Sequence, residues 1–113
     1  MFIKKSEAKK FQHNEACAIW EYEDLSPKFS FATSVINGRY PEDKRVCNTA
    51  CEEIYFIQSG NGVIHSEKGD FSVSQGDVYL FEQNEIYWVE GIHLLLVLVN
   101  IPKWTPEQHK SVE

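Results

Sequence analysis

The chain has 113 residues, a length that suits one domain built around a single hydrophobic core. Its 42% hydrophobic and 13% aromatic content argues against disorder. Seventeen acidic residues against eleven basic ones give a net charge of -6, which repels phosphate backbones and excludes nucleic acid as the expected partner.

Neither end of the chain has the pattern of a targeting or membrane segment. Met1 to Phe11 contains four lysines and no apolar run, so it is neither a secretory signal nor an anchor. The longest apolar stretch, Ile92 to Val99, is far shorter than the roughly 20 residues of a membrane helix. We therefore expect a cytoplasmic protein with no membrane partner.

Turn signals occur every eight to twelve residues, which is typical of a β-sandwich. No repeat or linker divides the chain, so residues 1–113 are expected to form one domain. The expected strands are Ala16 to Glu23, Phe29 to Asn37, Glu53 to Gln58, Gly62 to Glu67, Asp70 to Ser74, Val78 to Glu82, Tyr87 to Glu90 and Ile92 to Asn100.

A short C-terminal helix is expected to follow these strands. Thr105 fits its N-cap, Pro106 the first helical position and Gln108 the partner in a capping box. We expect this helix to cover one end of the sandwich.

The three cysteines do not predict a disulfide framework. They are an odd number in a chain without an export signal, so reduced thiols are expected. Cys47 and Cys51 lack a second Cys or His pair at a spacing that would complete a structural zinc site.

The glycine spacing between Glu53 and Gly76 resembles that of the cupin superfamily. Six residues separate Glu53 from Gly60, as in the first cupin motif, and Gly76 can open the second. The resemblance implies a small all-β jelly roll of β-sandwich or barrel form, with its motif region at about 38–104.

The resemblance also indicates where metal ligands would lie. Counting back from Glu53, the two histidines of the first motif fall on Cys47 and Thr49, or on Val46 and Asn48. Counting forward from Gly76, the second motif ends at Tyr87. Only Glu53 matches a ligand position, so no histidine-based metal site and no cofactor is expected. The alternative is a divalent metal held by Cys47, Glu53 and Tyr87.

The same comparison predicts a polar, aromatic pocket formed by Asn48 or Cys47 with Glu53, Tyr55 and Tyr87. Glu53 and Tyr55 have the same parity on one strand and should share a face. We expect Asn48 and Tyr87 to hydrogen-bond the Glu53 carboxylate. Glu53 is the candidate catalytic residue; alternatively it is an internally bonded carboxylate, and Tyr87 either contacts ligand or only packs.

Other polar residues are expected to lie away from this pocket. The four histidines are His13, His65, His93 and His109, all outside the motif positions. His93 is expected to be a core or rim residue. Arg39 and Arg45 are expected to be exposed loop charges, although either could instead place a cation at the barrel mouth.

Two function classes follow from this pattern. The first is a metal-free binding module for a small polar or sugar-like molecule. The second is an isomerase-like or epimerase-like enzyme that uses Glu53 or Tyr87 for acid–base chemistry. We also expect a homodimer because exposed edge strands need covering, with Phe2 to Ala18 as the expected interface.

Overall fold

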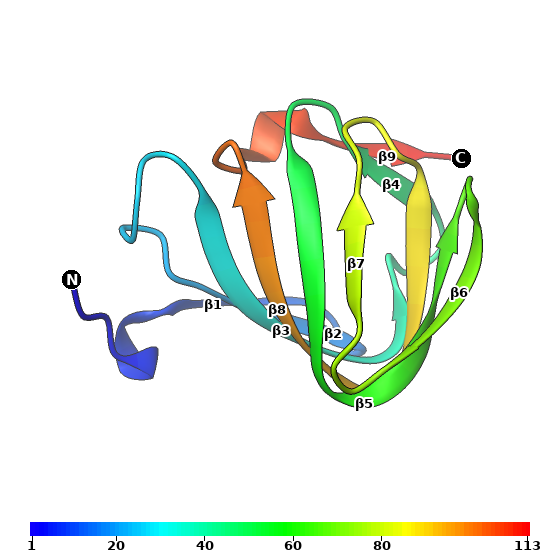
Figure 1. The fold of residues 1–113 in the computed structure, drawn as a ribbon, viewed down its shortest axis with the longest axis horizontal. Helices are drawn as coiled ribbons and strands as arrows, with labels where there is room; N and C mark the ends of the chain where they lie inside the picture. The colour runs from blue at the N-terminus through cyan, green and yellow to red at the C-terminus, as the bar shows by residue number, and fades with distance from the viewer.

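Nine strands curl into a half-barrel in the computed structural model, which describes residues 1–113 (Figure 1). The only helical segments are two single 3₁₀ turns, η1 (Lys5–Glu7) and η2 (Pro106–Gln108). The strands are β1 (Lys9–Asn14), β2 (Cys17–Glu21), β3 (Ser30–Tyr40), β4 (Arg45–Asn48), β5 (Glu52–Ser66), β6 (Gly69–Ser74), β7 (Val78–Phe81), β8 (Tyr87–Ile101) and β9 (His109–Val112).

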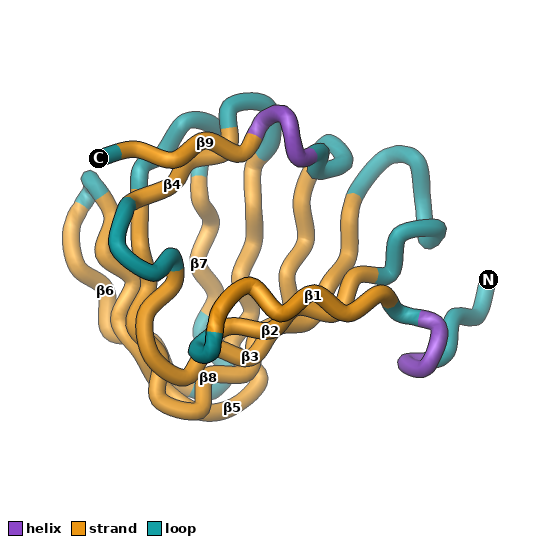
Figure 2. The backbone as a smooth tube through the Cα atoms, turned by 180° about the vertical axis from the view of Figure 1, so that it is seen from behind, coloured by secondary structure: helices purple, strands orange, loops and turns teal.

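All strand pairings are antiparallel, and β8 is the central strand. The sheet runs β1-β2-β3-β8-β4-β9, while β5 pairs with β8 on one side and with β6 and β7 on the other. Figure 2 shows how the long strands bend, so that β1, β2 and β3 cross in front of the curled sheet.

Two strand breaks expected from the sequence are absent. β5 continues through Gly60 and β8 continues through Gly91. A Cβ on Gly60 would lie 2.0 Å from the carbonyl oxygen of His93, and one on Gly91 would lie 2.4 Å from that of Ile36. These glycines therefore allow close approach of neighbouring strands at bulges, instead of ending a strand.

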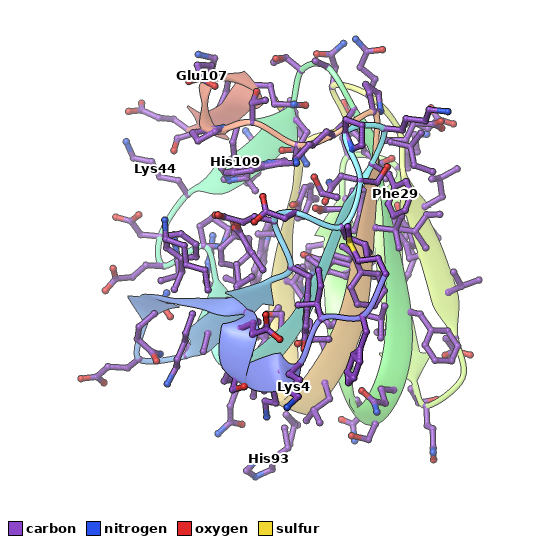
Figure 3. All side chains as sticks on the ribbon, turned by 90° about the vertical axis from the view of Figure 1, so that its left-hand side faces the viewer. Lys4, Phe29, Lys44, His93, Glu107 and His109 are labelled. Carbon is purple, nitrogen blue, oxygen red and sulfur yellow. The ribbon has the colours of Figure 1, made fainter.

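The bulge in β8 changes which side chains face the core. Before it, Tyr87 and Val89 are buried; after it, Leu94, Leu96 and Leu98 are buried. His93 sits at the bulge with a φ of 45° and is exposed. Of the two places expected for His93, the core is wrong, and Figure 3 shows the side chain projecting from one end of the molecule.

Three strands that the sequence pattern did not predict complete the sheet, namely β1, β4 and β9. Each is short or largely polar, so it lacks a clear apolar alternation. The expected C-terminal helix is only the turn η2, and Thr105 makes no side-chain capping bond there. The chain then enters β9, which pairs with β4 so that His109 lies opposite Asn48.

The core contains fifteen buried apolar residues drawn chiefly from β3, β5 and β8. It includes aromatic pairs such as Tyr55 with Phe81, whose ring centroids are 4.8 Å apart in an edge-on arrangement. The three cysteines are buried and unpaired. No helix of the structure has the length and apolarity needed to cross a membrane.

Candidate functional site

A cavity of about 920 Å³ occupies the concave side of the sheet. Strands β1, β2, β3, β5 and β8 form its walls, and the C-terminal segment closes part of one side. Its polar and aromatic lining includes His13, Tyr22, Tyr40, Glu53, Tyr55, Tyr87, Asn100, Trp104 and His109. A shallower depression of about 570 Å³ lies elsewhere, between β3, β5, β6 and β8, and contains none of these groups.

Glu53 is the buried carboxyl group of the cavity. Its side chain is held at both oxygens: Tyr87 Oη donates to Oε1 at 3.1 Å, and Asn100 Nδ2 donates to Oε2 at 2.8 Å. Asn100 lies directly opposite Glu53 in the β5–β8 ladder. Burial raises the pKa of Glu53, and the two hydrogen bonds only partly oppose that effect.

Three tyrosines surround this carboxyl group and stay in the neutral phenol form. Burial raises the pKa of Tyr55 and Tyr87 well above the ordinary value, and the charge of Glu53 adds to the shift. Burial and the same carboxylate also raise the pKa of Tyr40. The cavity wall is therefore rich in hydrogen-bond donors around one acid.

A second polar network lines the cavity beside Tyr40. The Tyr40 hydroxyl lies 3.1 Å from His109 Nε2, and His109 Nδ1 lies 2.8 Å from Asn48 Oδ1. Trp104 Nε1 donates to the same Asn48 oxygen at 3.1 Å. Burial lowers the pKa of His109, with a smaller contribution from the charge of His13.

The hydrogen bonds of this network determine where the protons lie. An indole N–H can only donate, so the Asn48 atom that it contacts is the amide oxygen. His109 Nδ1 must then carry the proton that it donates to Asn48. In the neutral ring Nε2 is unprotonated and accepts the hydrogen bond from the Tyr40 hydroxyl.

The structure brings together only part of the pocket expected from the sequence. Glu53, Tyr55 and Tyr87 line the cavity, and Glu53 and Tyr55 share the inner face of β5. Asn48 and Cys47 are buried but lie outside the lining. The expectation that Asn48 bonds Glu53 is wrong.

Asn100 takes the place expected for Asn48, and it could have been found from the sequence. It shares the parity of Leu94, Leu96 and Leu98 and is the one polar member of that series. Tyr40 and His109 were also missed. No local signal identifies them, because their contact joins residues 69 positions apart.

The side chains of Arg39 and Arg45 make their contacts outside the cavity. The Arg39 guanidinium lies 3.9 Å from the ring centre of Trp88 and donates to the carbonyl oxygens of Pro41 and Lys44. Arg45 donates to the backbone carbonyl of Glu113. Neither supplies a cation to the cavity. The expectation of exposed loop charges is wrong in part, because Arg39 is half-buried in β3 and Arg45, although exposed, begins β4.

The cavity does not have the donor set of a cupin metal site. No group of three or more His, Cys, Asp and Glu side chains is placed to hold a metal ion. Both oxygens of Glu53 are bonded to Tyr87 and Asn100, and Cys47 lies outside the lining. Cys47, Glu53 and Tyr87, the alternative ligand set, are therefore not arranged to hold one metal ion together.

Comparison with known proteins identifies the fold. No family model and no curated protein matches the sequence. Among solved structures, a tyrosine-to-phenylalanine variant of Streptomyces Pac13 with uridine has a TM-score of 0.90 at 15% identity, covering 100% of this chain and 90% of that one. Pac13 is described as a unique nucleoside dehydratase.

Other solved structures share the same architecture. Ectoine synthase from P. lautus has a TM-score of 0.78 at 15% identity, covering 100% of this chain and 91% of that one. KdgF from Halomonas sp. has a TM-score of 0.74 at 11% identity, covering 92% and 96%. These are cupin-fold proteins. The protein is a cupin jelly roll, and the fold expected from the glycine spacing is confirmed.

Proposed function

We propose that the cavity binds an uncharged, hydroxylated small molecule of nucleoside size and that Glu53 exchanges a proton with it. The observation that carries this proposal is the buried Glu53 carboxyl group in the wall of a cavity of about 920 Å³. A buried carboxyl group with a raised pKa is a typical general acid or base. Polar side chains in a wall that is otherwise aromatic and aliphatic suit a ligand with several hydroxyl groups.

The charges in the cavity lining favour a ligand without phosphate. Only two cations line the cavity, Lys9 and Lys103. Lys9 lies 3.9 Å from the Glu23 carboxylate, and Lys103 donates to the Glu23 carbonyl oxygen at 2.8 Å. Glu21 and Asp24 add further negative charge. A phosphate group would meet net repulsion here.

The likeness to Pac13 supports a nucleoside as the first ligand to test. Structures of Pac13 variants with uridine align with this chain over nearly its whole length. At 15% identity this likeness concerns the fold, so the chemical argument for this chain rests on Glu53 and the neutral phenols around it.

Titration calorimetry and thermal unfolding with uridine and uridine 5′-monophosphate test the binding proposal. We expect uridine to raise the melting temperature by mass action and the monophosphate to bind at least tenfold more weakly. Equal binding of the two would contradict the charge argument. Failure of uridine and of a panel of nucleosides and free sugars to bind would contradict the proposed ligand class.

Turnover is tested by incubating the protein with the bound compounds and following products by NMR. Glu53→Gln keeps the size of the side chain and removes its proton exchange, so we expect turnover to be lost while binding persists. Glu52→Gln is the matched control because Glu52 precedes it on β5 and is exposed. Turnover that survives Glu53→Gln would contradict the acid–base role.

A binding module without chemistry is the second candidate. It is favoured by the hydrogen bonds that both oxygens of Glu53 already accept, because a carboxyl group held in this way can serve structure alone. This candidate would be favoured over an enzyme if uridine bound tightly, no product formed, and Glu53→Gln left the affinity for uridine unchanged.

A further inference from the structure

The network of Tyr40, His109, Asn48 and Trp104 has no role in the proton exchange assigned to Glu53. It joins elements far apart in the chain: Tyr40 ends β3, Asn48 ends β4, and His109 begins β9. Figure 3 shows His109 below the C-terminal turn that carries Glu107. Only Tyr40, His109 and Trp104 of this network also line the cavity.

We propose that Tyr40 and His109 form a second proton-transfer pair, in which Tyr40 Oη takes a proton from the bound molecule while its own proton passes to His109 Nε2. This inference rests on the proposed function, since it needs a ligand in the cavity. It assigns Tyr40 as the group that touches the ligand and His109 as the group that acts through Tyr40.

The direction of transfer follows from the hydrogen bonds. Asn48 Oδ1 accepts from His109 Nδ1 at 2.8 Å, which fixes the ring with Nε2 toward the Tyr40 hydroxyl at 3.1 Å. Trp104 holds the same Asn48 oxygen at 3.1 Å. The amide is thereby held in one orientation, so the neutral His109 ring carries its proton on Nδ1 and presents an unprotonated Nε2 to Tyr40.

The step conserves atoms and charge. An O–H or C–H bond of the ligand breaks, its electron pair stays on the ligand, and the proton bonds to Tyr40 Oη. The earlier Tyr40 O–H bond breaks as the Nε2–H bond forms. Tyr40 remains a neutral phenol, and His109 becomes an imidazolium whose Nδ1–H still bonds to Asn48.

Two separate proton-transfer groups define a narrower class of reaction. Glu53 and Tyr40 both line the cavity, and they are close enough for the Glu53 charge to influence Tyr40. One group can remove a proton while the other supplies one to a leaving hydroxyl group or to a second carbon. Elimination of water and isomerisation can both use this pairing.

Long-range ¹H–¹⁵N NMR of the imidazole rings tests the pair without any turnover. The four histidines are assigned with His109→Gln. We expect neutral His109 at pH 7 with the proton on Nδ1. In Tyr40→Phe the donor to Nε2 is lost, so the pKa of His109 should rise by about 0.5 to 1. Tyr22→Phe is the matched control, because Tyr22 lines the cavity but the His109 ring is hydrogen-bonded to Tyr40 and Asn48 and not to Tyr22.

Uridine then tests whether the pair responds to a ligand. Saturating uridine should move the ¹⁵N resonance of Nε2 more than that of Nδ1 in the unmodified protein and leave both unmoved in Tyr40→Phe. The proposal is overturned if the spectra show that His109 is cationic at pH 7 or that the neutral ring is protonated on Nε2. Uridine that binds without moving Nε2 overturns it while leaving the proposed function intact. If uridine does not bind, the same measurement is made with a nucleoside or sugar from the panel that does. If calorimetry finds no binding for any member of the panel, both proposals are overturned.

Discussion

The hydrogen bond from Tyr87 to Glu53 makes a quantitative prediction for Tyr87→Phe. Both residues are buried, at 2% and 6% exposure, and the bond measures 3.1 Å. The substitution removes one hydroxyl and leaves Glu53 Oε1 without its donor. A bond to a charged group contributes about 1.5–3 kcal/mol, against about 0.5–1.5 kcal/mol for a neutral one. The loss should therefore be larger at pH 8, where Glu53 is more ionised, than at pH 5.

Urea unfolding followed by tryptophan fluorescence measures this difference at both pH values. A loss of 2 kcal/mol corresponds to a fall of about 8 °C in melting temperature for a domain of this length. In a Glu53→Gln background the loss should be near 1 kcal/mol at either pH, since the amide oxygen is uncharged. Tyr22→Phe is the control and should change stability by less than about 0.5 kcal/mol.

A loss below about 0.5 kcal/mol at both pH values would refute the assignment of the bond. An equal loss at pH 5 and pH 8, unchanged in the Glu53→Gln background, would refute the claim that the bond strengthens as Glu53 ionises.

The remaining predictions concern pH, the bulge and assembly. Because burial raises the pKa of Glu53 above 4.5, the native chain keeps a proton that the unfolded chain releases. Unfolding free energy should fall as pH rises through the folded pKa, and Glu53→Gln should lack that fall; parallel pH profiles would disprove it. At the bulge, His93→Gly should stabilise by about 0.5–1 kcal/mol by relieving a positive φ. Gly60→Ala should destabilise by about 2–3 kcal/mol, and urea unfolding checks both signs. We expect a homodimer, because β1 has a free edge; a monomer mass by light scattering would exclude it.

The sequence predicted the fold class because turn signals and strand periodicity survive in the structure. It misplaced strand ends at Gly60 and Gly91, since a glycine needed for close backbone approach looks the same as one in a turn. It missed β1, β4 and β9 because short or exposed strands need no apolar alternation. Their pairing depends on distant segments.

From the sequence, the relative placement of site residues could be predicted only where they lie on the same strand. Glu53 and Tyr55 share a face because β5 has no bulge between them, so counting by two is valid. The same counting fails across His93, where the bulge reverses the parity of β8. The contact between Asn48 and His109 spans 61 residues and depends on the chain crossing the end of the barrel, which no local pattern indicates.

Burial gives the two proton-transfer groups opposite tendencies that suit acid–base chemistry. A low-dielectric wall favours the neutral form of every group, so it drives Glu53 toward the acid and His109 toward the base. The phenols of Tyr40 and Tyr55 stay protonated and can relay protons without carrying charge. A neutral ligand would thus meet a proton donor and a proton acceptor at once, which either residue alone would not provide.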